Sequence, residues 1–235
     1  MNKIIKNVSI CLLLMMISWN SMAAFVLNGT RFIYGEGNKN ISFEVTNNSE
    51  KSYGGQVWLE NETENNDRVI MIPTPSFFRI GPKQKQIMRI IKTEEKLPTD
   101  RESLFWLNVQ EVPPKPESED GNVLSVAINT RVKVFYRPKH LQSERNGAEK
   151  KIRIGRFAED IQVINPTPYY FSLVGINMGK EPLNLSDKEI SALGNIPPFG
   201  KVSLGKRTLT SNLTISAIND WGGIETIDVE TSSYE

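Results

Sequence analysis

The chain has 235 residues, with 28 lysines and arginines, 27 aspartates and glutamates, and one histidine. This length allows one large domain or two ordinary domains, and each could bury a core of its own. The near balance of charge leaves no basic excess of the kind that binds nucleic acid or an anionic membrane. We therefore expect no nucleic-acid partner.

Residues 1–23 have the pattern of a secretory signal peptide. Lys3 and Lys6 give a positive start, and residues 10–17 are an uninterrupted apolar block. Residues 21–23 (SMA) supply small residues for cleavage after position 23, with cleavage after Ala24 as the alternative. A membrane anchor is the alternative, but the block is shorter than the roughly 20 residues that span a bilayer. We expect an exported mature chain with 26 basic and 27 acidic residues.

Residues 24–137 alternate short apolar-polar stretches with turn-forming residues, and no stretch has a convincing amphipathic helical pattern. The predicted strands cover residues 25–27, 31–34, 40–47, 56–60, 69–72, 86–92, 103–112 and 122–138. A kink is expected at Gly29, and the strand at 69–72 is expected to end at Pro73. This spacing predicts one immunoglobulin-like β-sandwich.

The longest predicted strand, residues 122–138, carries an apolar row at its start and a cation further along. Leu124, Val126 and Ile128 alternate with small or polar residues, and Lys133 lies between two valines. Periodicity alone does not tell whether this apolar row faces the chain's own core or another protein, because either row of a strand can face inward.

A second, less regular series of strands follows a polar stretch at 139–149 that is typical of a linker. The predicted strands lie at 152–154, 160–165, 169–174, 211–218 and 224–229. We predict an all-β chain of two β-sandwich domains, with a signal peptide at 1–23, an N-terminal domain at 24–142 and a C-terminal domain at 143–235.

Catalytic and metal-binding sets are hard to assemble from these residues. The single histidine, His140, lies in the predicted linker, and the single cysteine, Cys11, lies in the signal segment, so we expect neither a nucleophilic triad nor a Cys/His metal site. Carboxylate pairs such as Asp100 with Glu102 could serve glycoside hydrolysis, but they fall in charged turns. We therefore expect no enzymatic activity, no cofactor and no small-molecule substrate.

Residues 97–114, LPTDRESLFWLNVQEVPP, closely resemble the signature of periplasmic pilus (fimbrial) chaperones. Residues 29–31, 122–138, 165–170 and 218–223 are similar to the same family in the same order, so the resemblance covers the mature chain. It implies two immunoglobulin-like domains set at an angle with a cleft between them. It also implies a periplasmic chaperone that binds, folds and caps pilus subunits by donor-strand complementation and delivers them to an outer-membrane usher.

The resemblance also implies roles for individual residues. Arg31 and Lys133 match two cleft cations that bind the C-terminal carboxylate of a pilus subunit. Leu124, Val126 and Ile128 match the donor residues that fill the open groove of a subunit lacking its last strand. The alternatives are that the two cations are ordinary surface residues of strands, and that the three aliphatic residues face the chain's own core.

Glu102, Arg137 and Asp220 match an ion network that holds the two domains at their angle. The short segment at 113–121 resembles the short-loop subgroup of the family. The second-domain disulfide that the family often carries is missing, because the mature chain has no cysteine. Self-association of the client-free chain is left open.

Two other classes of function remain as alternatives. A secreted adhesion or structural module without a client would have a complete sandwich and no exposed apolar row. A sugar hydrolase would need two carboxyl groups facing each other across one cleft, and the sequence gives no reason to expect them.

Overall fold

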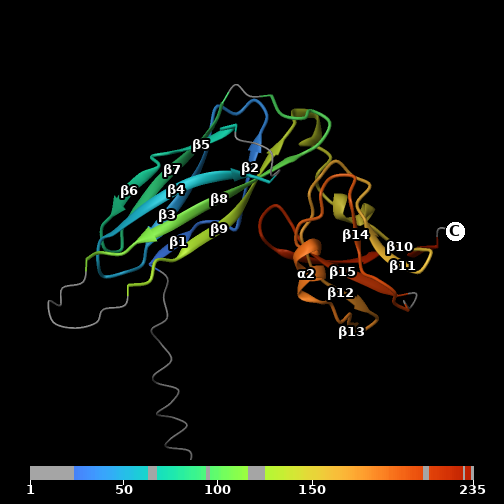
Figure 1. Cartoon of the computed structure of the whole chain (residues 1–235). Coiled ribbons are helices and arrows are strands. Elements are labelled where there is room, and N and C mark those ends of the chain that lie inside the picture. Colours follow the sequence, from blue (N-terminus) through green and yellow to red (C-terminus); the bar gives the residue numbers. More distant parts are fainter. Residues whose placement is uncertain are drawn as a thin grey trace, which may run out of the picture.

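The computed structural model describes residues 24–62, 68–93, 96–115, 125–208, 212–229 and 231–233, the last of these by backbone alone. The predicted signal peptide at 1–23 and Leu124 of the predicted donor row lie outside these residues. The described chain folds into two β domains, each with its own buried core (Figure 1). The prediction of an all-β chain of two immunoglobulin-like domains is confirmed.

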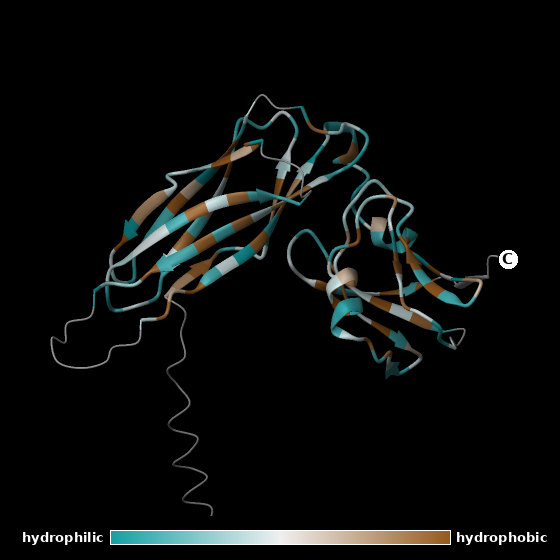
Figure 2. Cartoon of the chain, in the orientation of Figure 1, coloured by the Kyte–Doolittle hydropathy of each residue, from teal (hydrophilic) through white to brown (hydrophobic). Residues whose placement is uncertain are grey.

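The first domain packs two sheets against each other. One sheet has the order β1 (Phe25–Leu27), β3 (Ile41–Asn47), β7 (Lys85–Lys92) and β5 (Met71–Thr74). The other has the order β2 (Arg31–Gly35), β9 (Asn129–Arg137), β8 (Ser103–Val112), β4 (Tyr53–Asn61) and β6 (Phe77–Ile80). Hydrophobic and hydrophilic residues alternate along these strands (Figure 2). Such alternation places one face of each sheet on the shared core.

The opening strand changes sheets at the predicted kink. β1 pairs antiparallel with β3, whereas β2 pairs parallel with β9, from Arg31 opposite Lys133 to Gly35 opposite Arg137. At Gly29, a Cβ atom would lie 3.2 Å from the Phe32 ring, so the chain turns where a side chain would crowd that ring. Because β2 begins opposite Lys133, the part of β9 before that residue has no strand on this edge among the described residues.

Three predicted strands in the first domain have boundaries that are wrong by two residues or more. The strand predicted at 56–60 runs from Tyr53 to Asn61. The strand predicted at 69–72 runs instead from Met71 to Thr74 and includes Pro73. Proline fits there because β5 is an edge strand, where one side of the backbone has no ladder partner. The strand predicted at 122–138 begins only at Asn129. Residues 125–128 continue its alternation, but they are not part of a β-ladder.

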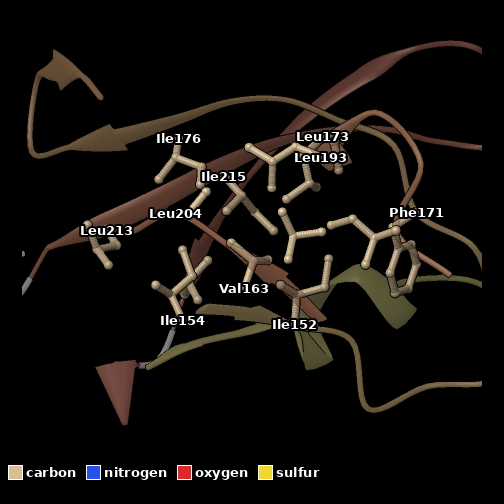
Figure 3. Close-up of a cluster of buried hydrophobic side chains, with 14 of the residues drawn as sticks. Ile152, Ile154, Val163, Phe171, Leu173, Ile176, Leu193, Leu204, Leu213 and Ile215 are labelled. Atoms are coloured by element: carbon tan, nitrogen blue, oxygen red, sulfur yellow. The ribbon is translucent and has the colours of Figure 1, made fainter. Parts of the chain in front are cut away.

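The second domain also packs two four-stranded sheets. One has the order β14 (Lys201–Ser203), β11 (Asp160–Ile164), β10 (Arg153–Phe157) and β17 (Thr231–Ser233). The other has the order β13 (Glu181–Pro182), β12 (Leu173–Met178), β15 (Leu213–Ile218) and β16 (Ile224–Val229). Between them lies an aliphatic core in which Ile154, Val163 and Ile215 are fully buried (Figure 3).

A short helix, α2 (Asp187–Leu193), is present although no helix was expected. It begins with a capping box: the Ser186 hydroxyl accepts a hydrogen bond from the Glu189 backbone N–H, and the Glu189 carboxylate accepts one from the Ser186 backbone N–H at 2.7 Å. Such a box satisfies backbone donors that have no partner inside the helix. Leu193 at its other end is buried in the core of the second domain.

The segment that joins the domains is packed rather than a free polar linker. It forms two short 3₁₀ helices, η1 (Lys139–Leu141) and η2 (Ala148–Lys151). Leu141 and Ala148 are buried in the core of the second domain. The predicted division between residues 142 and 143 stays a prediction.

Candidate functional site: the cleft between the domains

The unpaired edge of β9 continues into an exposed apolar row. Val132 and Val134 on the core-facing side of β9 are buried in the first domain. Val126 and Ile128 fall on the same alternation, yet their side chains are 63% and 40% exposed and belong to no core cluster. An exposed strand edge with alternating aliphatic residues is a template on which another chain can add a strand.

Lys133 lies where this unpaired edge ends, and it reaches toward the second domain. Its Nζ donates hydrogen bonds to Ser172 Oγ, at 2.8 Å, and to the Gly194 carbonyl oxygen, and it lies 5.4 Å from the centre of the Trp106 ring. All these partners are neutral. Burial, and then the nearby charge of Arg31, lower the pKa of Lys133 to about 8.

Arg31 lies directly opposite Lys133 on the neighbouring strand. Its Nη1 donates to the carbonyl oxygen of Ile218 in the second domain, at 2.9 Å, and its buried Nε has no hydrogen-bond partner among the described residues. Burial also lowers the pKa of this guanidinium. Two adjacent cations, both held mainly by neutral groups, form a site in which a carboxylate would satisfy charge and hydrogen bonding together.

A cavity of about 470 Å³ opens beside Arg31, between the two domains. It is lined by residues 28–33 of the first domain and by Asp220 and Trp221 of the second, with Arg137 also in its wall. The Trp221 side chain is 94% exposed at this cavity. The described residues therefore form a solvent-open space next to one of the two cleft cations.

Glu102, Arg137 and Asp220 come together in the structure. Arg137 Nε donates to Glu102 Oε1 at 2.6 Å, and its two terminal nitrogens donate to the two Asp220 oxygens at 2.7 and 3.0 Å. Glu102 Oε2 accepts from the backbone N–H of Tyr170 at 2.8 Å. One guanidinium from the first domain thus connects a carboxylate of its own domain with one from the β15–β16 turn of the second.

The two carboxylates of this network differ in their pKa. Burial raises the pKa of Glu102, although the charge of Arg137 opposes the change. Burial also opposes the charge of Asp220, but the hydrogen bonds from Arg137 and the charge of Arg145 outweigh it, so the pKa of Asp220 is lowered. Asp220 is therefore the carboxylate whose charge the network favours.

The sequence interpretation missed two further members of this network. Arg145 Nη1 lies 2.6 Å from Glu149 Oε1, and Arg145 Nε lies 3.5 Å from Asp220 Oδ1. Both Arg145 and Glu149 are buried, although their segment was interpreted as a solvated linker. The available signal was the spacing of four residues between opposite charges, which suits one face of a helical turn.

The described ranges contain no group of histidine, cysteine, aspartate and glutamate side chains that suits a metal ion. Among the same residues, no helix has the length and apolar character needed to cross a membrane.

A two-domain immunoglobulin-like fold with an open strand edge is the architecture of proteins that pair a strand with another chain. Two family models cover almost all of the described chain: "Pili and flagellar-assembly chaperone, PapD N-terminal domain" matches residues 24–142, and "Pili assembly chaperone PapD, C-terminal domain" matches residues 147–228. The chain belongs to the PapD family of pilus-assembly chaperones. It is a periplasmic chaperone and not an enzyme.

Individual relatives agree with this assignment. The chaperone protein FanE of Escherichia coli is 42% identical over 232 residues, which cover 99% of this chain and 100% of FanE. The crystal structure of the periplasmic chaperone SfaE is 33% identical, with a TM-score of 0.70 over 88% of this chain and 99% of SfaE. The SafB chaperone of Salmonella enterica, solved in complex with the SafA pilin, matches at 25% identity with a TM-score of 0.75, over 90% of this chain and 98% of the matched chain.

Proposed function

We propose that this chaperone binds and folds pilus subunits by donating the open edge of β9, caps them, and delivers them to an outer-membrane usher. The observation that carries the proposal is the exposed row of Val126 and Ile128, which continues an unpaired edge up to Lys133. SafB, a relative of this chain, has been solved in complex with a pilin.

The donated edge supplies two kinds of interaction. Main-chain groups of residues 125–132 pair with the subunit, while Val126, Ile128 and, from sequence, Leu124 fill the groove left by its missing strand. Burial of each aliphatic side chain contributes about 1.5–3 kcal/mol before the cost of ordering. These contacts give affinity for any subunit whose groove has the same alternating shape.

The two cations fix the position of the subunit along that edge. Its C-terminal carboxylate accepts charge-assisted hydrogen bonds from Arg31 and Lys133, which are stronger than those that the two side chains make with neutral groups. The carboxylate lies at a chain end, so anchoring it sets which subunit residue faces each donor residue.

Substitution of the cations tests this function. In a titration with a purified pilin subunit, we expect Lys133→Met and Arg31→Met each to weaken binding about 10- to 100-fold, the range for a lost charged hydrogen bond. Arg131→Met is the matched control, because Arg131 lies two residues from Lys133 but is exposed and pairs with Glu60. Equal affinities of Lys133→Met and Arg131→Met would contradict the anchoring role.

The ion network of Glu102, Arg137 and Asp220 is assigned the role of holding the domain angle, because Arg137, which is paired with the buried Glu102, joins the two domains through partly buried, charge-assisted contacts with Asp220. The signal peptide at 1–23 and the domain division after residue 142 remain part of this proposal. N-terminal sequencing of the exported protein tests the first: a mature chain starting at Ala24 is expected.

We place the chain in the short-loop subgroup from its sequence, because the segment at 113–121 that precedes the predicted donor strand is short. The same open edge offers a route to self-association of the client-free chain. Sedimentation at increasing concentration tests this: a dimer should form in the wild type and be lost in Val126→Asp. A monomer at every concentration would contradict it.

The described residues do not support the two alternative functions, a closed adhesion module and a sugar hydrolase. A closed adhesion module would bury the row that Val126 and Ile128 expose. A hydrolase would need a free pair of facing carboxyl groups, but Glu102 is paired with Arg137, and Asp100 is paired with Arg101.

A further inference from the structure

The end of α2 closes onto the first domain beside Lys133. The Asn195 amide nitrogen donates to Glu62 Oε1 at 2.5 Å, across the two domains. Glu62 Oε2 accepts a hydrogen bond from Trp106 Nε1, and the neighbouring Gly194 carbonyl accepts one from Lys133. In Figure 1, α2 lies on the side of the second domain that faces β8 and β9.

One polar atom in this contact has no partner. Asn195 Oδ1 is buried and accepts no hydrogen bond from the described residues. Buried polar atoms are nearly always paired, so each exception needs an explanation. If this contact opened, water would hydrogen-bond Asn195 Oδ1 and remove the free-energy cost of leaving it unpaired. The free energy needed to open the contact is therefore smaller than its hydrogen bonds alone would suggest.

We propose that Glu62 and Asn195 form a latch that holds the Gly194 carbonyl over Lys133 in the client-free chaperone, and that a client opens it. The inference rests on the proposed anchoring function, because it concerns the same cation. The client carboxylate carries a full charge, whereas the Gly194 carbonyl carries only a partial one. The carboxylate therefore replaces the carbonyl at the Lys133 ammonium, and the end of α2 moves away.

The latch makes Glu62 and Asn195 positioning residues rather than binding residues. They contact neither Val126 nor Ile128, and their effect on a client passes through the availability of Lys133. Their removal should therefore strengthen client binding, whereas the removal of a residue that touches the client would weaken it. The direction of the change in client affinity therefore distinguishes a latch residue from a residue of the binding surface.

Titration with a defined peptide tests the proposal. The probe is a synthetic peptide that alternates valine with serine and threonine and ends in a free carboxylate, together with its C-terminally amidated form. We expect Asn195→Ala to bind the free-acid peptide about two- to tenfold more tightly than wild type, the range for one lost hydrogen bond. Asn195→Asp, which places a carboxylate against Glu62, should have at least the same effect.

The matched control is Asn177→Ala. The Asn177 amide donates to Thr214 Oγ1 at 3.3 Å within the second domain and makes no contact across the cleft in the described structure. Its affinity for the free-acid peptide should equal that of wild type. The amidated peptide, which has no terminal charge, should bind wild type and Asn195→Ala with the same affinity.

A second measurement detects the latch without any client. The Trp106 ring nitrogen donates to Glu62, so fluorine NMR of chaperone labelled with 5-fluorotryptophan reports this contact, with Trp106→Phe assigning the signal. We expect Asn195→Ala to move the Trp106 signal toward its position in peptide-bound wild type.

The outcomes distinguish the latch from the function on which it rests. If Lys133→Met binds both peptides like wild type, the anchoring function is wrong. If Lys133→Met weakens binding of the free-acid peptide but Asn195→Ala neither tightens it nor moves the Trp106 signal, anchoring stands and the latch is wrong.

Discussion

At the scale of single residues, burial decides which charges are available to a client. Lys133 and Arg131 lie on the same side of β9, two positions apart. Arg131 is exposed, and its Nη2 lies 2.9 Å from Glu60 Oε2, so water and a carboxylate both satisfy it. Lys133 is largely buried against neutral partners, and its charge is therefore held in an environment that disfavours it. A ligand carboxylate would give the Lys133 ammonium a negatively charged hydrogen-bond acceptor, in place of the hydroxyl and carbonyl oxygens that it contacts here.

The pKa of Lys133, lowered to about 8, predicts how client binding depends on pH. Below pH 8 the amine is charged and binds a carboxylate. Above it the free chaperone loses the proton, so affinity should fall by up to about tenfold per pH unit. Titration of wild type between about pH 6.5 and 9.5 measures this fall, and Lys133→Arg should show none. A flat wild-type profile would contradict it.

The same shift predicts the opposite trend for the stability of the client-free chain. In the unfolded chain the lysine has its ordinary pKa of 10.5, so between about pH 8 and 10.5 the unfolded chain binds more protons than the folded chain. The contribution of Lys133 to the free energy of unfolding therefore rises with pH in this window. The difference between wild type and Lys133→Arg in urea unfolding measures it.

Removal of Arg137 should destabilise the fold strongly. Arg137→Met leaves the buried Glu102 without its cation and leaves Asp220 with Arg145 as its ion-pair partner, and such an unpaired buried charge costs about 3–5 kcal/mol. Lys206→Met is the control, since its ion pair with Glu159 is exposed and is worth less than about 1 kcal/mol. Urea unfolding measures the free energy of unfolding of both variants. Equal decreases for the two would show that Arg137 contributes no more to stability than an exposed ion pair.

At the scale of elements, β9 has two halves with different partners. Its second half lies between β2 and β8, while its first half pairs with β8 alone. The sheet switch at Gly29 causes this, because the opening strand reaches β9 only at Arg31. The free edge is thus a consequence of where an earlier strand changes sheets.

Two valines of one alternation should therefore behave oppositely. Val126→Asp is expected to abolish client binding and to change the free energy of unfolding by less than about 0.5 kcal/mol, because Val126 is exposed. Val134→Ala should cost about 2 kcal/mol of stability but leave client binding intact, because Val134 is fully buried. Binding titration and urea unfolding distinguish them. Retained binding by Val126→Asp would exclude the donor role.

Periodicity placed β3, β7 and β8 to within one residue, but it placed the strand predicted at 169–174 too early, since β12 runs from Leu173 to Met178. It overestimated β9 because the alternation of Val126 and Ile128 continues beyond the β-ladder. It underestimated α2, although Ser186 and Glu189 have the spacing of a capping box, because a helix of seven residues shows little periodicity.

Contacts between residues on opposite sides of the cleft could not be predicted from the sequence, except where the resemblance to a family implied them. Glu62 and Asn195 are separated by 133 positions, and neither stands in a motif. Arg145 and Glu149 have a visible spacing, but their burial depends on how the joining segment packs on the second domain. Local pattern carries no information on such packing.

At the scale of the whole molecule, contacts on two sides of the cleft join the domains. On one side, Arg137 binds Asp220 in the β15–β16 turn. On the other, Glu62 binds Asn195 at the end of α2. The contact of Arg137 with Asp220 is a partly buried, bidentate ion pair, whereas Glu62 and Asn195 share a single hydrogen bond. We therefore infer that the ion pair holds the domain angle while the hydrogen bond can open.

Loss of Asp220 should accordingly loosen the domain arrangement. Asp220→Ala removes the carboxylate that Arg137 and Arg145 share, and small-angle X-ray scattering should then show a larger maximum dimension and a broader distance distribution. Asp228→Ala, on the exposed side of β16, is the matched control and should scatter like wild type. Identical curves for both variants would show that the network does not set the angle.

The position of the two cations at the end of the free edge also sets a direction. With its carboxyl terminus held at Arg31 and Lys133, a client's last segment has to run alongside residues 125–132 in the same sense as β9. β2 also runs parallel to β9, starting at Arg31. The client segment and β2 would therefore lie end to end along the same edge of β9, with a chain break between them. In the proposed binding mode, the subunit would therefore pair in parallel with the chaperone, in place of the antiparallel closure usual for an immunoglobulin fold.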